Sequence, residues 1–334
     1  MWLVPIIRVE SLTKVYKGET KPAVDAISLE ILEGEVYGLL GPNGAGKTTT
    51  INMLTTRLSS TRGKASVGGH DINRESMAIR RIIGVVPQDL TADEDLSGRE
   101  NLLLVASFYD VPKKTAAERA SKLLNMVDLA DAADKHVREY SGGMRKRLEL
   151  IIGLINEPRV LFLDEPTLGL DVQTRSVMWD YITTLKRDYN MTIILTSHYL
   201  EEIDALADRV SIVDHGKIIV TGTPGELKAS LKGDIVTMGF RDGQDTAPVK
   251  EYGGIIEILD SKPGTLKIRV ADADSELPDL MGFVFKKGIS ITTLSVQKPS
   301  LDEVFLRYTG RSLREDAPAD RFKNAMNMRR MRQA

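Results

Sequence analysis

Short apolar segments dominate the pattern of hydrophobic and polar positions over the first two thirds of the chain, and most of them predict β-strands. Residues 23–32 alternate apolar and polar side chains, as a half-buried strand does, and residues 6–16 precede them as another strand. Residues 82–88 form a continuous run rich in β-branched side chains, which favours a fully buried strand. Further strands are predicted at 35–40, 63–67, 159–166, 191–196 and 210–213.

Helices are predicted between these strands, at residues 48–54, 99–109 and 115–126. Near the end of the last one, Leu123, Leu124 and Val127 have the spacing of an apolar helical stripe, which is typical of a helix that faces a core. Strands that alternate with helices indicate an α/β fold.

Residues 223–225, Thr-Pro-Gly, mark a boundary after which the pattern changes to that of a small α+β unit. We therefore expect one domain at 1–224, a second at 225–310 and a basic tail at 311–334. Two interpretations of the tail stay open, a flexible end and a basic segment that touches anionic lipid. In the second domain no cysteine, histidine or carboxylate pair gathers into a recognisable site. Its predicted strands are 234–240, 255–259, 265–270 and 289–296, and its predicted helices are 277–287 and 301–308.

Composition narrows the class of protein. A length of 334 residues suits two domains, and a net charge of −2 gives no indication of a nucleic-acid partner. The absence of cysteine excludes disulfides and thiol catalysis and fits a reducing compartment. No apolar run approaches the ~18–20 residues that cross a bilayer, and the apolar start lacks the marks of a signal peptide. We expect a soluble chain that reaches a membrane only through a partner.

Residues 41–48, with the sequence GPNGAGKT, match the P-loop pattern G-x-x-x-x-G-K-[ST]. A predicted strand precedes them and a predicted helix follows. A glycine-rich turn in that place directs backbone N–H groups and a helix N-terminus at an anion. Lys47 can reach the β- and γ-phosphates, and the Thr48 hydroxyl can bind Mg²⁺. This stretch predicts a site for a nucleoside triphosphate.

Two adjacent carboxylates, Asp164 and Glu165, follow four apolar residues at the end of a predicted strand. Because consecutive strand residues point to opposite faces, the two side chains cannot have the same role. One can serve the Mg²⁺ shell, as a strand-end Asp of P-loop NTPases does, and the other can activate the attacking water. His198, at the end of another strand, either contacts the γ-phosphate or belongs to the scaffold.

Ser141 predicts a helix N-cap, and Gly142 and Gly143 offer free N–H groups at the start of that helix, which makes a second possible anion site. The same three residues also fit an ordinary loop. The basic run at 145–147 predicts a solvated helix face. Tyr16 has two interpretations at even weight, a loop aromatic that stacks on a purine and a half-buried residue at a strand end.

Six motifs occur in the order that is found in ATP-binding-cassette (ABC) nucleotide-binding domains, and residues 5–230 resemble such a domain. The motifs are the P-loop, Gln88, YSGGM at 140–144, LFLDE at 161–165, Leu170-Asp171 and His198. Residues 299–306 are similar to the C-terminal motif of daunorubicin-resistance-type ATPases. Met144, Tyr140 and Gly169 depart from the commonest family residues, and the same departures occur in the drug-resistance branch.

The resemblance implies a mixed-sheet core, a helical subdomain at about 89–145, and an accessory C-terminal domain for dimerisation or regulation. It implies that Tyr16 stacks on adenine with support from Val24, that Glu165 is the catalytic base and that His198 contacts the γ-phosphate. Mg²⁺ is assigned to Thr48, Gln88 and Asp164. The full set of nucleotide-contacting residues is Tyr16, Gly41, Pro42, Asn43, Gly44, Ala45, Gly46, Lys47, Thr48, Thr49, Gln88, Ser141, Gly142, Gly143 and Asp171, of which Asp171 also organises the dimer.

The resemblance also implies partners. Two copies would pack head to tail, with Ser141–Gly142–Gly143 of one capping the ATP on the P-loop of the other. A separate transmembrane permease would dock near Gln88, on the cytoplasmic face of the cell membrane, for export of drug- or lipid-like substrates. The alternative is a soluble ABC-type ATPase with a non-membrane partner, although such proteins usually carry two cassettes or a coiled-coil insertion. An ordinary P-loop GTPase or kinase is disfavoured, because no [NT]-K-x-D segment for guanine is present and the Ser141 motif would be unexplained.

Overall fold

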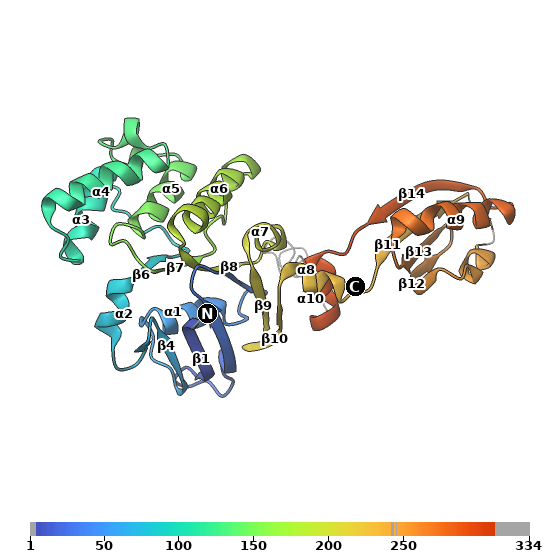
Figure 1. Cartoon of the computed structure of the whole chain (residues 1–334), viewed down its shortest axis with the longest axis horizontal. Helices are drawn as coiled ribbons and strands as arrows, with labels where there is room; N and C mark the ends of the chain where they lie inside the picture. Colours follow the sequence, from blue (N-terminus) through green and yellow to red (C-terminus); the bar gives the residue numbers. More distant parts are fainter. Residues whose placement is uncertain (1–4, 242–243, 245, 311–334) are drawn as a thin grey trace, which may run out of the picture. The chain divides into compact units, whose positions relative to one another are not determined.

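The computed structural model describes residues 5–241, 244 and 246–310. The predicted tail at 311–334 lies outside these residues. The described chain divides into two compact units, with the boundary in the sequence between Pro224 and Gly225, and each is described by itself (Figure 1).

The first unit contains a six-stranded sheet in the order β10-β9-β3-β8-β7-β6. All neighbours in it are parallel except the last hairpin, β9–β10. Strands β3, β7 and β8 are fully buried, which explains their continuous apolar sequences. The bounds are β3 Val36–Leu40, β6 Ile83–Val86, β7 Val160–Asp164, β8 Thr192–Ser197, β9 Arg209–Asp214 and β10 Lys217–Gly222.

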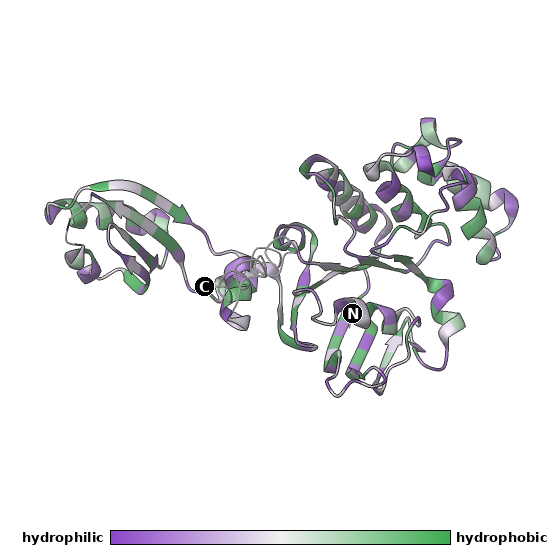
Figure 2. Cartoon of the chain, turned by 180° about the vertical axis from the view of Figure 1, so that it is seen from behind, coloured by the Kyte–Doolittle hydropathy of each residue, from purple (hydrophilic) through white to green (hydrophobic). Residues whose placement is uncertain are grey.

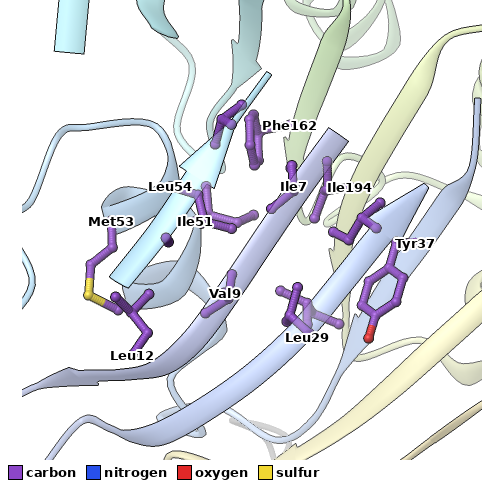
Figure 3. Close-up of a cluster of buried hydrophobic side chains, with 14 of the residues drawn as sticks. Ile7, Val9, Leu12, Leu29, Tyr37, Ile51, Met53, Leu54, Phe162 and Ile194 are labelled. Carbon is purple, nitrogen blue, oxygen red and sulfur yellow. The ribbon is translucent and has the colours of Figure 1, made fainter. Parts of the chain in front are cut away.

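A second, antiparallel sheet has the order β2-β1-β4-β5, with β1 Pro5–Lys14, β2 Val24–Leu32, β4 Arg62–Val67 and β5 His70–Asp71. Helix α1, Lys47–Leu54, packs between the two sheets. Figure 3 shows the core that results. The antiparallel sheet contributes Ile7, Val9, Leu12 and Leu29, helix α1 contributes Ile51, Met53 and Leu54, and the parallel sheet contributes Tyr37, Phe162 and Ile194.

A helical group follows β6, in which α3 and α5 both pack beside α4 (Figure 1). Ser97 caps α3 through a capping box with Glu100. None of the helices within the described ranges is both long enough and apolar enough to cross a bilayer. The helices of this unit, besides α1, are α2 Ser76–Ile82, α3 Gly98–Phe108, α4 Lys113–Met126, α5 Gly142–Ile152, α6 Val172–Tyr189 and α7 Leu200–Leu206, with short 3₁₀ turns η1 Ala130–Ala132 and η2 Val137–Glu139.

The strand predicted at 82–88 is shorter in the structure, because Ile82 is the last residue of α2 and β6 ends at Val86. In the predicted stripe of α4, Leu124 and Val127 are buried, whereas Leu123 is only half-buried and lines a surface pocket. Figure 2 shows hydrophobic residues along the strands of the six-stranded sheet, whereas the helices of this unit carry hydrophilic and hydrophobic residues side by side.

The second unit contains an antiparallel sheet in the order β12-β13-β11-β14, with helix α9 on one face. Val236, Met238, Leu266 and Ile268 on the sheet pack against Leu280 of this helix. The bounds are α8 Pro224–Ala229, β11 Asp234–Phe240, η3 Ala247–Glu251, β12 Ile255–Lys262, β13 Thr265–Val270, α9 Ala273–Lys286, β14 Ile291–Gln297 and α10 Leu301–Thr309.

Candidate nucleotide site

The P-loop connects β3 to α1, and two of its glycines have conformations that favour glycine. Gly44 and Gly46 have φ of 81° and 104°, in the left-handed region. Gly41 does not have a positive φ. It needs the absence of a side chain for another reason, because a Cβ there would collide with the carbonyl oxygen of Val213. The loop is therefore packed tightly against its neighbours.

Lys47 is the first residue of α1, and its side chain is buried. Its Nζ donates to the carbonyl oxygens of Gly41 and Pro42, at 2.6 and 3.2 Å, and lies 3.7 Å from Oε1 of Glu165. Burial lowers the pKa of Lys47, and the negative charges of Glu165 and Asp164 offset only part of this effect. The amine thus joins the P-loop to the end of β7.

Thr48 and Asp164 meet beside Lys47. The Thr48 hydroxyl donates to Oδ1 of Asp164 at 3.2 Å, and the Thr196 hydroxyl donates to the same oxygen at 2.6 Å. A hydroxyl and a carboxylate are hard oxygen donors, which suit Mg²⁺. The described residues contain no cluster of three His, Cys, Asp or Glu side chains able to hold a metal. Mg²⁺ does not require one, because phosphates and water supply most of its ligands.

Glu165 follows the last residue of β7 and adopts a φ of 52°, which is uncommon for a residue other than glycine. Its backbone N–H donates to the Thr196 hydroxyl at 3.0 Å, which holds this conformation. Its Oε2 lies 3.2 Å from Nδ1 of His198. Burial by itself raises the pKa of Glu165, but His198 and Lys47 together outweigh burial, and the pKa lies below the usual glutamate value. The side chain is therefore an ionised carboxylate that can accept a proton.

The two adjacent carboxylates thus contact different partners. Asp164 contacts Thr48 and Thr196, whereas Glu165 contacts Lys47 and His198. His198 follows the end of β8, and its ring packs against that of Tyr199 with centroids 4.2 Å apart.

Gln88 and Tyr16, which both precede Asp164 in the sequence, are exposed. The backbone carbonyl of Gln88 accepts a hydrogen bond from Lys146 Nζ at 2.9 Å. Tyr16 lies beyond the end of β1 with 42% of its surface exposed, and its hydroxyl is 3.2 Å from that of Thr49 on α1. An accessible aromatic ring therefore stands beside the helix that the P-loop begins.

Ser141 and Asp171 cap the two helices α5 and α6. The Ser141 hydroxyl accepts from the N–H of Met144 at 3.3 Å, and Asp171 accepts from the N–H of Thr174 at 2.8 Å. Hydrogen bonds from the backbone and the side chain of Thr174 hold the pKa of Asp171 below its usual value. Among the described residues, no hydrogen bond or ion pair connects Ser141, Gly142, Gly143 or Asp171 to Lys47 or Glu165 of the same chain.

The prediction that residues 145–147 form a solvated face was wrong. Lys146 is buried against Gln88, and Arg147 donates to the carbonyl oxygen of Val127 at 2.8 Å. Arg145 donates to the carbonyl oxygens of Arg138 and Tyr140. These cations donate hydrogen bonds to backbone carbonyl groups of neighbouring segments, which would otherwise lack a partner among the described residues. The local sequence pattern does not reveal that those carbonyl groups need one.

Three buried polar residues near the site were missed from the sequence, namely Thr196, Glu149 and Glu202. Thr196 is the residue before the last of β8, a strand that also contains Thr192 and Ser197, so the sequence does not single it out. Glu149 stands between Leu148 and Leu150 in an apolar run, which is the signal that could have identified it as buried. Glu202 directly follows the exposed Glu201, and nothing in the sequence separates the two.

The P-loop between β3 and α1, with Thr48 against Asp164 and Lys47 against Glu165, defines a P-loop nucleoside triphosphatase. Residues 24–168 match the ABC transporter family, and residues 222–309 match the C-terminal domain of DrrA1-3-like ATP-binding proteins. The chain is 43% identical over 291 residues to daunorubicin resistance ATP-binding protein DrrA3 of Streptomyces coeruleorubidus, which covers 87% of this chain and 92% of that protein. The chain belongs to the ABC transporter family, as an ATP-binding and ATP-hydrolysing subunit.

Other comparisons agree. The chain is 41% identical over 309 residues to daunorubicin/doxorubicin resistance ATP-binding protein DrrA of Streptomyces peucetius. This match covers 91% of this chain and 92% of that protein. A dimeric post-hydrolysis structure of the ATP-binding cassette MJ0796 with ADP and Pi is similar, with a TM-score of 0.60 and 25% identity over 65% of this chain and 98% of that one. The structure of cbiO1 from Clostridium perfringens is also similar, with a TM-score of 0.62 and 29% identity. The match covers 68% of this chain and 92% of that one. The predicted ABC fold and ATPase activity are confirmed.

Proposed function

We propose that the chain drives an exporter of drug- or lipid-like molecules by hydrolysing ATP on behalf of a separate membrane subunit. The similarity to resistance proteins along both units carries this proposal. Besides DrrA3 and DrrA, it includes linearmycin resistance ATP-binding protein LnrL of Bacillus subtilis, which is 33% identical over 93% of this chain. Another relative, from Ralstonia nicotianae, is named Nod factor export ATP-binding protein I and is 35% identical over 93% of the chain.

In this proposal the nucleotide lies along the P-loop. The adenine stacks on the exposed ring of Tyr16, beside Val24, and the loop amides with Lys47 and Thr49 hold the phosphates. The support is the position of Tyr16 against Thr49 and of Lys47 at the first turn of α1. Thr48, Gln88 and Asp164 would hold Mg²⁺, which offsets phosphate charge when it is bound.

Glu165 is the proposed general base. As an ionised carboxylate at the end of β7, it can take the proton of a water that attacks the γ-phosphate. Lys47 stabilises the charge that develops on the phosphate oxygens, and His198, 3.2 Å from Glu165, contacts the γ-phosphate. Because Glu165 has an unusual backbone conformation that Thr196 supports, its carboxylate is held in place before substrate arrives.

The proposed catalytic unit is a dimer of this chain. Ser141 and Gly142 stand exposed at the start of α5, where free N–H groups favour an anion, and they have no bond to their own P-loop site among the described residues. Two solved structures of the MJ0796 cassette are dimeric. In our proposal Ser141–Gly143 of one copy caps the ATP on the other, and Asp171 helps to organise the pair.

The membrane subunit would dock near Gln88 and the helices that follow it, which places the chain at the cytoplasmic face of the membrane. An exposed apolar side chain on α3 supports this position, since Phe108 is 73% exposed. We assign the unit at 225–310 to dimerisation or regulation, in line with its match to the DrrA1-3-like C-terminal domain.

Co-expression with a multi-span membrane protein encoded beside this gene tests the proposal. The chain should purify with that protein from membranes, and daunorubicin should stimulate its ATPase activity, while a Glu165→Gln chain should co-purify without activity. A chain that stays out of the membrane fraction and hydrolyses ATP at an unchanged rate would favour the alternative, an ABC-type ATPase with a non-membrane partner.

A further inference from the structure

A buried carboxylate, Glu202 on α7, lies behind the proposed catalytic residues. Its exposed fraction is 0%, and its Oε1 accepts two hydrogen bonds, from the hydroxyl of Thr167 at 2.9 Å and from Nε1 of Trp179 at 3.2 Å. Thr167 is also fully buried. Burying a carboxylate costs free energy unless hydrogen bonds compensate it, so the hydrogen bonds of Glu202 constrain the groups that it joins.

Glu202 and its two partners belong to three segments that each lead to the site. Thr167 follows Glu165 by two residues, and Glu202 itself follows His198 by four. Trp179 belongs to α6, the helix that Asp171 caps. One carboxylate oxygen therefore ties the segment after the proposed base, the helix after His198 and the helix after Asp171.

A second set of contacts links α6 to the turn that carries His198. The guanidinium of Arg175, on α6, stacks over the Tyr199 ring at 4.2 Å, and that ring packs against His198. The N–H of Tyr199 donates to the Ser197 hydroxyl at 2.9 Å. The His198 turn is thus held from α6 as well as from α7, and movement of either helix would displace the imidazole.

We infer that Glu202 is a positioning residue for ATP hydrolysis, which fixes Glu165 and His198 relative to each other through Thr167. The inference rests on the proposed roles of Glu165 and His198. Glu202 is separate from the residues assigned to phosphate or Mg²⁺, so its loss leaves nucleotide affinity intact. Displacement of a catalytic group by about 1 Å can slow the chemical step on the order of 100-fold.

The variants that test this are Glu202→Ala, Glu202→Gln and Thr167→Val, with Thr167→Ser as the conservative change. Glu202→Ala and Thr167→Val should lower kcat about 10- to 100-fold and leave KM for ATP within about twofold. Glu202→Gln keeps an oxygen that accepts from Thr167 and Trp179, and Thr167→Ser keeps the hydroxyl, so both should stay within a few-fold of wild type. Glu201→Ala is the matched control, an exposed glutamate one residue away on α7.

The full chain is assayed at saturating ATP and Mg²⁺, beside its melting temperature and its nucleotide Kd. Unchanged kcat in Thr167→Val and Glu202→Ala, with an inactive Glu165→Gln chain, overturns this inference alone. A rise in KM that accompanies the fall in kcat also overturns it. So does an equal loss of kcat in Glu202→Gln and Glu202→Ala, because a positioning role predicts neither result. Full activity in Glu165→Gln overturns the proposed base instead.

Discussion

Glu149 offers a prediction that the structure makes quantitative. The side chain lies on α5, 1% exposed, and its two oxygens accept three hydrogen bonds from the segment after Gln88. The N–H groups of Thr91 and Ala92 donate at 2.6 and 2.7 Å, and the Thr91 hydroxyl donates at 2.9 Å. With Lys146 on the Gln88 carbonyl, these bonds attach residues 88–92 to the helix that Ser141 begins. The change Glu149→Ala removes all three.

The expected loss is large because the acceptor is a buried carboxylate. Hydrogen bonds to a charged group contribute about 1.5–3 kcal/mol each. The segment at 91–92 lies in part at the surface, so water replaces some of what is lost. We therefore expect Glu149→Ala to lower the local stability of this segment by about 3 kcal/mol. Glu149→Gln retains one acceptor oxygen and should lose about half as much.

Hydrogen exchange measures this change where it occurs. A drop of about 3 kcal/mol corresponds to roughly 100-fold faster exchange of the Thr91 and Ala92 amides. The matched control is Glu118→Ala, an exposed glutamate on α4, which should leave those amides unchanged. Exchange at wild-type rates in Glu149→Ala would refute the view that this carboxylate holds the segment, and equal acceleration in the control would refute its specificity.

Three other predictions concern catalysis, the tail and pH. Glu165→Gln should bind ATP with wild-type affinity, lose nearly all turnover and accumulate as an ATP-bound dimer in size-exclusion chromatography; full turnover would contradict the assignment. Truncation after Gly310 should leave ATPase turnover nearly intact, and a collapse would show that the tail is needed. Burial raises the pKa of Glu202, so the stability that its protonated form contributes is present below the ordinary glutamate pKa and is lost as pH rises through the raised pKa. Denaturation at several pH values should show that rising pH lowers the free energy of unfolding less in Glu202→Gln than in the wild type. The same dependence of stability on pH in both chains would contradict this.

The sequence was sufficient where a local pattern determines local structure. The P-loop was recognisable because phosphate binding requires glycines, Lys47 and Thr48 at a fixed spacing between a strand and a helix. Asp164 and Glu165 were identifiable because carboxylates at the end of an apolar strand are otherwise costly. Most strands followed from their continuous or alternating apolar residues, and the order of motifs was enough to indicate the family.

What escaped prediction depends on contacts between distant segments. Helix α6 is amphipathic but was not predicted, and neither were α2 and α7. Lys146 was taken for a solvated cation because periodicity describes a helix by itself, whereas its partner is a carbonyl 58 residues earlier in the chain. Glu202 and the exposed Glu201 are adjacent and chemically identical, and only the packing of α7 distinguishes them. Tertiary partners of this kind do not follow from composition or spacing.

In the proposed dimer, the P-loop of one copy and Ser141–Gly143 of another form one site. Mixing two inactive chains, Lys47→Ala and Ser141→Arg, tests it directly. In a mixed dimer one of the two composite sites has an intact P-loop and an intact Ser141 segment, so ATPase activity should return in part, with a maximum near equal amounts. If no ratio of the two chains restores activity while each still binds its partner, the composite site is contradicted.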